Sequence, residues 1–321
     1  MHLLVVNDDG PPSTQTSPYV YSLVRTLQRA GHNVSVVLPN TQRSWIGKAH
    51  IIGQTVKPSY FRPSLHHKDN GTTHSRPLPP LSPSEEEEWI LVDGTPASCV
   101  QIGLYHYFQE RGPIDLVISG PNYGRNTTSV FSLSSGTLGG ALEAALCKHR
   151  SIAISYGFFS RNHDDEIINE ASNLSLRLIE YLYKNWDNQV DLYSINIPLT
   201  KNVGEKKVLW TNILQNYWSH GSCFEEVEDT DEDDKLEQST SKNENNSIQL
   251  DTPLIEKKII KHQHKHFKWA PRFTDVNRSI EESPPGNDGW AVQNGYTSVT
   301  PLKANFMHAA AKTQGELVLN L

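Results

Sequence analysis

Short apolar runs alternate with amphipathic patterns along the first two hundred residues. Continuous apolar runs are typical of parallel strands covered on both faces, and apolar residues three or four apart are typical of helices. The runs predict strands at Leu3–Asn7, Asn33–Leu38, Trp89–Val92, Asp115–Ser119, Ser151–Ser155 and Leu192–Ile197. The helical spacings predict helices at Ser17–Ala30, Pro96–Gln109, Gly136–Lys148 and Asp164–Asn185. Because strand–helix–strand units build parallel sheets, residues 1–200 are expected to form an α/β core, a doubly wound Rossmann-like parallel sheet.

The pattern is less regular after this core. Residues 201–321 are predicted to form a C-terminal β-rich extension, in which Trp290–Val292 and Tyr296–Val299 are strand candidates. Two polar insertions interrupt the pattern, one at 57–88 rich in proline, serine and histidine, and one at 225–261 that begins with a run of acids. Both are too polar to pack, and we expect the second to be disordered. We expect a single domain over residues 1–321.

Charge and hydropathy narrow the class of protein. The net charge is −7, but Glu225–Glu237 alone carries −8, so the remainder is close to neutral and offers no broad basic surface for nucleic acid. No apolar stretch approaches the roughly 20 residues that a membrane-spanning helix needs, and no secretory leader precedes the first strand. We expect a cytoplasmic or nuclear protein with neither nucleic acid nor membrane as a partner. The three cysteines form no disulfide framework, and Cys99 and Cys147 fit core packing.

Oxygen and amide side chains follow several of the predicted strands. Ligands of open α/β sheets bind beyond the carboxyl ends of the strands, so the residues that follow each strand are the candidates for a site. Asp8 and Asp9 follow the first strand, Ser44 follows the second, and Asn122 and Asn126 follow the strand at Asp115–Ser119. We expect these side chains to gather at one edge of the sheet.

The adjacent carboxylates of Asp8 and Asp9 are the strongest of these features. Two neighbouring charges at the end of a buried strand are costly unless a cation neutralises them, and hard oxygen ligands suit Mg²⁺, Mn²⁺ or Ca²⁺. A solvated Asp-Asp-Gly turn explains the pair equally well when it is taken alone. A phosphoacceptor site of the receiver type also uses an acidic pair after its first strand, although such domains are much shorter.

The other candidates also have two interpretations each. Ser135, Gly136 and Thr137 begin a helix, where backbone N–H groups and the helix dipole favour an anion such as phosphate, or where Ser135 is simply an N-cap. Asn122 and Asn126 are either ligands or turn residues, and Ser44 is either a ligand or a local cap. Alternating histidines at 262, 264 and 266 could bind a transition metal, but a solvated linker fits them better.

Taken together, these segments resemble the SurE family of metal-dependent phosphatases and nucleotidases. The resemblance rests on LLVVNDDG, QRS, DGTPASC, SGPNYGRN and SSGTLGGALEA in that order, and it continues through LYSINIP to GYTSVTPL. It therefore covers nearly the whole chain and is strongest to the fungal branch, some members of which carry this domain ahead of a tubulin-tyrosine-ligase-like domain.

The resemblance implies a function and a set of roles. The implied activity is hydrolysis of phosphate monoesters, either nucleoside monophosphates or the small esters taken by acid phosphatases, in a homodimer or homotetramer. One divalent cation, Mg²⁺ or Mn²⁺, would be bound in each subunit by Asp8, Asp9, Ser44 and Asn122. Phosphate would be surrounded by Asn7, Asn126, Ser135, Gly136 and Thr137. In the mechanism, Asp8 or Asp9 would accept the proton of the attacking water.

Three segments depart from the bacterial pattern of the family. Trp45 stands where bacterial members usually have glycine, PPSTQTSP replaces a short apolar-glycine segment after the first motif, and Pro121 replaces an isoleucine. None of these changes removes an implied ligand, so they affect substrate size and preference more than catalysis. The bulk of Trp45 also keeps open an alternative, namely a SurE-like module that binds nucleotide or phosphate with little or no turnover.

Overall fold

The computed structural model describes residues 1–306 apart from 65–70, 80–87, 160–163 and 228–264. The chain divides into two compact units, one made of Met1–Tyr217 with Ser279–Leu321 and the other of Trp218–Arg278. The first unit contains the sheet and the candidate site. Much of the acidic insertion predicted at 225–261, together with His262 and His264, lies outside the described residues.

Six parallel strands form the centre of a ten-stranded sheet, and all six were predicted from their apolar runs. Their spatial order is β5-β2-β1-β6-β7-β8, so the chain reverses direction across the sheet between β1 and β6. A ligand site is expected at such a switch point, beyond the carboxyl ends of these two strands. The bounds are β1 His2–Val6, β2 Asn33–Pro39, β5 Trp89–Val92, β6 Leu116–Tyr123, β7 Ser151–Gly157 and β8 Leu192–Pro198.

The six central strands confirm the expected doubly wound parallel core, and the outer strands make the complete sheet a mixed one. At one edge, β3 (Ser59–Arg62) runs antiparallel to β5, and β4 (Thr72–His74) pairs with β3. At the other edge, β12 (Thr297–Leu302) runs antiparallel to β8, and β9 (Val208–Trp210) runs parallel to β12. The first insertion was therefore wrongly judged too polar to pack, because Phe61 is buried within it and its ring centroid lies 5.8 Å from that of Trp89.

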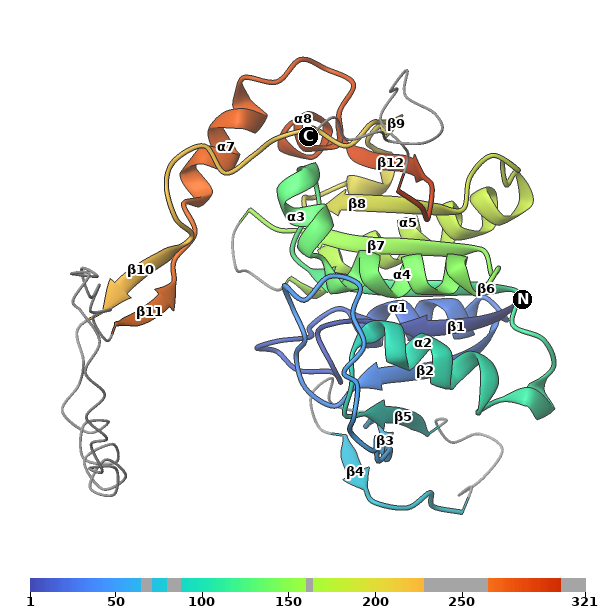
Figure 1. Ribbon diagram of the computed structural model, residues 1–321. Coiled ribbons are helices and arrows are strands. Elements are labelled where there is room, and N and C mark those ends of the chain that lie inside the picture. Colours follow the sequence, from blue (N-terminus) through green and yellow to red (C-terminus); the bar gives the residue numbers. More distant parts are fainter. Residues whose placement is uncertain (65–70, 80–87, 160–163, 228–264, 307–321) are drawn as a thin grey trace, which may run out of the picture. The chain divides into compact units, whose positions relative to one another are not determined.

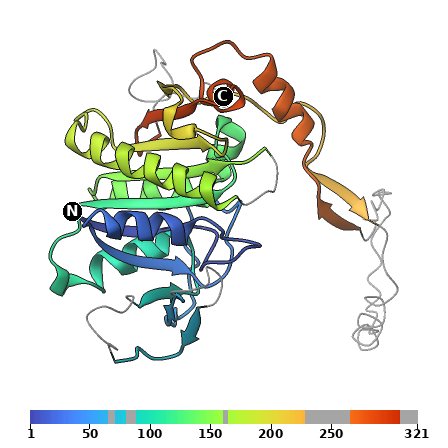
Figure 2. The ribbon, with the colours of Figure 1, turned by 180° about the vertical axis from the view of Figure 1, so that it is seen from behind.

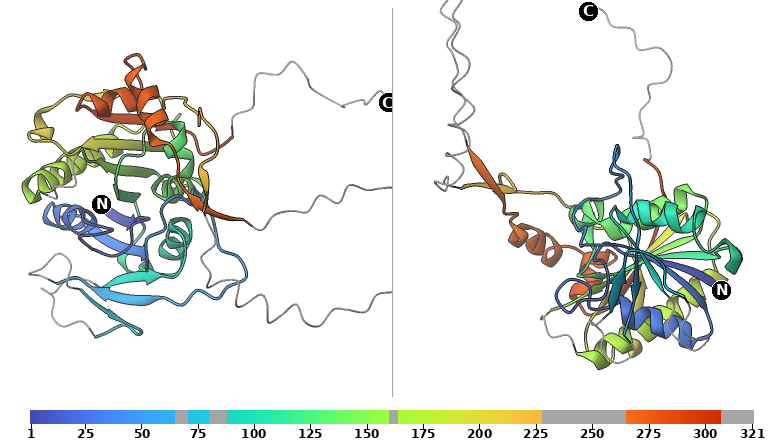
Figure 3. Two further views of the ribbon diagram at one scale, coloured as in Figure 1. Left: turned by 90° about the vertical axis from the view of Figure 1, so that its left-hand side faces the viewer. Right: turned by 90° about the horizontal axis from the view of Figure 1, so that it is seen from below.

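Helices cover both faces of this sheet. Helices α2 (Pro96–Tyr105) and α4 (Gly136–Leu146) pack together on one face, and α1 (Val20–Arg29) and α5 (Asp165–Lys184) pack on the other. Figure 1 shows the first face, Figure 2 the second, and the right-hand view of Figure 3 shows the pairs on opposite sides of the strands. These four helices confirm the prediction, although α1 begins at Val20 rather than at Ser17. The backbone N–H and carbonyl of Ser17 are both hydrogen-bonded to Ser13, so Ser17 is not part of the helix.

The C-terminal region contains helices as well as strands. Strand β12 confirms the candidate at Tyr296–Val299, but Trp290–Val292 lies in helix α8 (Asp288–Gln293) and was wrongly predicted as a strand. The Asn287 side chain accepts from the Trp290 N–H at 2.8 Å and so caps this helix. The remaining elements are α3 (Thr128–Ser134), α7 (Phe273–Glu281), η1 (Gln109–Arg111), η2 (Val203–Glu205), and the pair β10 (Phe224–Val227) and β11 (His266–Trp269).

The described residues also bear on the expectations about a membrane-spanning helix and about the packing of Cys99 and Cys147. No helix among them is both long and apolar enough to cross a bilayer. Cys99 is fully buried in the core, as predicted, whereas Cys147 is half-buried and its sulfur accepts from the Gln101 side chain at 3.3 Å.

Candidate active site

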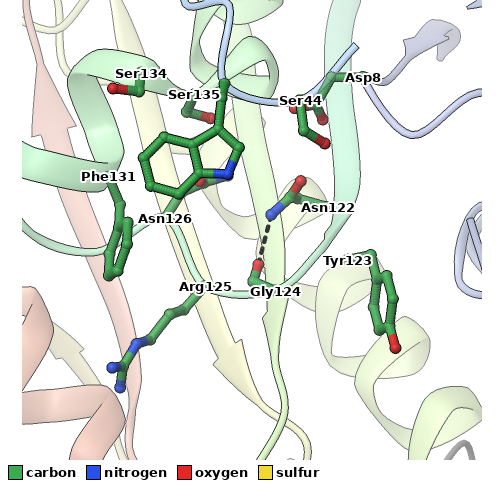
Figure 4. Close-up of a pocket in the computed structure, with 11 residues that line it drawn as sticks. Asp8, Ser44, Asn122, Tyr123, Gly124, Arg125, Asn126, Phe131, Ser134 and Ser135 are labelled. Carbon is green, nitrogen blue, oxygen red and sulfur yellow. Dashed lines mark hydrogen bonds between the residues drawn. The ribbon is translucent and has the colours of Figure 1, made fainter. Parts of the chain in front are cut away.

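A small pocket lies beyond the carboxyl ends of β1 and β6, at the switch point of the sheet. Its volume is about 160 Å³. Figure 4 shows Asp8, Ser44 and Asn122 on one side of this pocket and Phe131 and Arg125 on the other. The lining residues are Asp8, Ser44, Trp45, Asn122, Tyr123, Gly124, Arg125, Asn126, Phe131, Ser134 and Ser135. The structure thus brings together five of the nine site residues expected from the sequence.

The turn after β1 is held by the first residue of its motif. The Asn7 side chain donates to the Gly10 carbonyl at 2.8 Å and accepts from the Gly10 N–H at 3.0 Å. Gly10 has a φ of 88°, which residues with a side chain rarely adopt. Asn7 is fully buried and is not among the residues that line the pocket. Its amide therefore fixes the turn that carries Asp8 and Asp9; the place beside phosphate that the resemblance implies for Asn7 stays a prediction.

Asp8 and Asp9 are both buried, each with 2% of its surface exposed. The Thr137 hydroxyl donates to Asp8 Oδ1 at 2.6 Å, and the Tyr123 backbone N–H donates to Asp9 Oδ2 at 2.6 Å. Burial raises the pKa of Asp8 from 3.8 to about 6, against hydrogen bonds from Thr137 and Gly136 that favour the charged form. Burial and the charge of Asp8 raise the pKa of Asp9 well above its ordinary value. The pair is therefore costly to ionise alone, and a cation would lower that cost.

The start of α4 packs directly against Asp8. The Ser135 hydroxyl accepts from the Leu138 N–H at 3.1 Å, which is the N-cap interaction considered for it, and Ser135 also lines the pocket. Thr137 and Gly136 are buried and do not line the pocket. A Cβ on Gly136 would lie 2.8 Å from the Asp8 Cβ, so this position leaves no room for a side chain. Gly136 and Thr137 thus support Asp8, and Ser135 faces the pocket.

The loop after β6 carries the two asparagines. Asn122 donates from its Nδ2 to the Gly124 carbonyl at 2.7 Å, as drawn in Figure 4, so its Oδ1 is the atom that could serve as a ligand. Asn126 donates from its Nδ2 to the Ser155 hydroxyl at 3.0 Å, and its backbone N–H donates to Asn196 Oδ1 at 2.7 Å. Strands β7 and β8 therefore fix the orientation of Asn126 through these two partners.

Residues of the loop after β2 close the pocket from another side. The Arg43 N–H donates to the Asp8 carbonyl at 2.6 Å, and the Gly47 N–H donates to the Ser134 carbonyl at 2.9 Å. Ser44 and Trp45 lie between these two anchors, and both line the pocket. Ser44 is thereby brought beside Asp8 although 36 residues separate them in the chain.

Arg125 and Phe131 are among the lining residues that the sequence analysis missed. Arg125 lies between Asn122 and Asn126 in the SGPNYGRN motif. A positive side chain between two candidate ligands is an indication of an anion-binding site that the sequence analysis did not use. Phe131 belongs to α3, a seven-residue helix that is too short to show a helical period. Asp288 was missed as a support for this region, where its carboxylate accepts from the Thr128 N–H at 3.0 Å and from the Leu214 N–H at 2.9 Å.

Comparisons with known proteins show the family and the fold of this chain. The model of the family described as survival protein SurE matches residues 3–220. The probable tubulin–tyrosine ligase PBY1 of Saccharomyces cerevisiae is 34% identical over 95% of this chain, but the match spans only 41% of the length of that relative. The 5′-nucleotidases SurE of Rhodopirellula baltica and Methanocaldococcus jannaschii are 28% and 29% identical, over 71% and 72% of this chain and 78% and 86% of theirs. A crystal structure of SurE protein from Aquifex aeolicus has a TM-score of 0.60 at 22% identity, covering 96% of this chain and 95% of that one, and so shares the fold.

Proposed function

Because this chain belongs to the SurE family, we propose that it hydrolyses phosphate monoesters, with nucleoside monophosphates as its main substrates and small phosphate esters as further ones. The observation that carries the proposal is the buried Asp8, which lines the pocket at its base, together with its buried neighbour Asp9. The other polar lining consists of hydroxyl and amide groups and the guanidinium of Arg125. Such a donor set suits a hard divalent cation and a phosphate oxygen. The similarity to the 5′-nucleotidases SurE of Rhodopirellula baltica and Methanocaldococcus jannaschii supports the same reaction class.

The residues present fit a divalent cation. We assign Asp8, Asp9, Ser44 and Asn122 as the side chains that would hold one Mg²⁺ or Mn²⁺, since all four offer oxygen and the buried carboxylates lack a cationic partner among their recorded contacts. When bound, the ion would supply positive charge to the phosphate oxygens and make water more acidic.

The chain itself supplies orientation and proton transfer in this proposal. Asn126, held by β7 and β8, and Ser135, held at the start of α4, are assigned to the phosphate oxygens. Gly136 and Thr137 contribute the positive end of the α4 dipole, which favours the charge that builds up on phosphorus-bound oxygens during attack. Asp8 or Asp9 accepts the proton of the attacking water, and Asn7 acts through the turn that orients both.

The test is release of inorganic phosphate from p-nitrophenyl phosphate and from a set of nucleoside monophosphates, with Mg²⁺ or Mn²⁺ and with EDTA. We expect metal-dependent release that is lost in Asp8→Asn, whose Oδ1 can still accept from Thr137 so that the fold is retained. Asp93→Asn is the matched control, because Asp93 also follows a central strand but its side chain is 59% exposed. Absence of metal-dependent release, or normal release by Asp8→Asn, would contradict the proposal.

We further propose that the protein works as a homo-oligomer. Strands β10 and β11 expose Phe224, Phe267 and Trp269, a concentration of apolar surface on a two-stranded sheet that is typical of an interface. Light scattering at several concentrations should give the mass of a dimer or larger assembly, and a strictly monomeric mass would contradict this.

A further inference from the structure

Two aromatic side chains form the outer part of the pocket. The rings of Trp45 and Phe131 meet edge to face, with centroids 5.7 Å apart and an interplanar angle of 72°. Both line the pocket together with Asp8. Asp8 is buried, Phe131 is half-buried and Trp45 is 39% exposed, so the aromatic pair lies towards solvent and the carboxylate lies at the base.

The backbone places Trp45 there under constraint. Its φ is 63°, in the left-handed region that residues with a side chain rarely adopt. The loop is anchored before Trp45 by the Arg43 N–H on the Asp8 carbonyl, and after it by the Gly47 N–H on the Ser134 carbonyl. The Lys48 ammonium adds an ion pair with the buried Glu143 at 2.6 Å. An indole that keeps 39% of its surface in water contributes little to the core, so its strained and fixed position points to a ligand.

The size of the pocket shows which part of a ligand would meet these rings. Its volume is about 160 Å³, below the roughly 300 Å³ at which pockets for drug-sized ligands begin. A phosphate group and the first atoms of its ester fit that space. The rest of a larger leaving group has to lie further out, beside Trp45 and Phe131.

We propose that Trp45, supported edge-on by Phe131, stacks on the planar base of a nucleoside leaving group. This contact would make the enzyme selective for phosphate monoesters that carry a nucleobase. This inference rests on the phosphomonoesterase activity proposed above and concerns its substrate class. Every nucleobase has a π face, so stacking selects for the presence of a base and discriminates weakly between bases. Trp45 contacts no reacting atom in this scheme and acts on substrate recognition.

A matched pair of substrates isolates the effect of the base. Adenosine 5′-monophosphate and ribose 5-phosphate share the same primary ester, so their intrinsic reactivities are similar, and only the first carries a base. We expect Trp45→Ala to lower kcat/KM for adenosine 5′-monophosphate by about tenfold or more, the range that removal of one stacking side chain gives. Turnover of ribose 5-phosphate should stay within about twofold, which also reports that the variant is folded. Trp45→Phe should retain most of the preference.

A second exposed tryptophan provides the control. Trp210 is 60% exposed and lines a different cavity, near Tyr193, so Trp210→Ala should leave both substrates unchanged. An equal loss on both substrates in Trp45→Ala would mean that Trp45 supports the phosphate site, and no loss on either would mean that the indole has no role; each result overturns the inference. If the wild-type protein hydrolyses neither substrate at any metal concentration, the proposed function itself fails and the inference falls with it.

Discussion

The contact between Gly136 and Asp8 gives the sharpest single prediction about the site. A Cβ built on Gly136 would lie 2.8 Å from the Asp8 Cβ, 3.0 Å from Asp8 Oδ2 and 3.1 Å from the Arg43 carbonyl oxygen. Optimal separations between carbon atoms are about 3.5–4.0 Å, so Gly136→Ala must displace Asp8, the loop after β2 or the start of α4. The neighbours on the Arg43 side are backbone, which leaves Asp8 as the group that can move.

Two effects of opposite sign act on stability in this variant. Alanine in a helix is about 1 kcal/mol more favourable than glycine, whereas overpacking of a tight site costs about 1–3 kcal/mol. We therefore expect the free energy of unfolding to fall by at most about 2 kcal/mol. Activity should fall much further, by about a hundredfold, because displacement of a catalytic group by about 1 Å can cost that much.

Urea denaturation and phosphate release, measured on the same preparation, separate the two effects. Gly204→Ala, in η2, is the matched control. A Cβ on Gly204 would also meet a close neighbour, at 3.1 Å, but that neighbour is the flexible end of the Arg177 side chain. Gly204→Ala should keep full activity. If Gly136→Ala keeps kcat/KM within about twofold of the wild type, then the position of Asp8 is not critical and the reasoning about the site is wrong.

Three further predictions concern the groups around the site. Thr137→Val removes the 2.6 Å hydrogen bond to Asp8 and should lower the free energy of unfolding at neutral pH by about 1–3 kcal/mol as well as phosphate release, whereas Thr137→Ser should retain both. Lys48→Met should destabilise the protein in urea more than Glu143→Gln does, because it leaves a carboxylate that is 6% exposed with only Gln101 and His50 as partners. In Glu143→Gln the Lys48 side chain, which is 30% exposed, reaches water; equal losses would contradict this. Burial raises the pKa of Asp288 from 3.8 to about 6, so the folded state holds its proton more tightly and stability contributed by this group is lost as the pH rises from about 4 to above 6, by about 3 kcal/mol in total. Asp288→Asn should therefore flatten the pH dependence of the free energy of unfolding over that interval, and an unchanged slope would refute the assignment.

The central strands were predictable because burial on both faces requires continuous apolar runs. All five residues of β1 are buried, and the helices that cover them show their own apolar spacings. The edges were not predictable in this way. Strand β3 buries only Phe61 of its four residues, so its sequence reads as polar, and α8 has six residues, too few to show a helical period. The direction of the edge strands is set by the connections, which the apolar pattern does not report.

The gathering of Asp8, Ser44, Asn122, Asn126 and Ser135 followed from the rule about strand ends, since each comes after a strand or begins a helix at the same edge. The rule does not predict which polar groups at that edge form hydrogen bonds with one another. Asn7 was expected beside phosphate, but its amide is satisfied within the turn. Thr137 was expected there too, and its hydroxyl donates to a residue 129 positions earlier. Such pairings depend on side-chain positions to within about an ångström, and spacing along the chain carries no information on them.

The start of α4 affects the two aspartates differently, because its hydrogen bonds reach only Asp8. The Thr137 hydroxyl and the N–H groups of Gly136 and Thr137 all favour the charged form of Asp8, which therefore sits where an anion is best stabilised at a helix start. Asp9 has the Tyr123 N–H and the Gln42 side chain, but it also faces the charge of Asp8. Burial raises the pKa of both carboxyl groups, but Asp8 has more hydrogen bonds that favour its charged form, whereas Asp9 also faces the charge of Asp8. The start of α4 therefore supports Asp8 through Thr137 and Gly136, and in the function proposed above Ser135 would in addition face the phosphate.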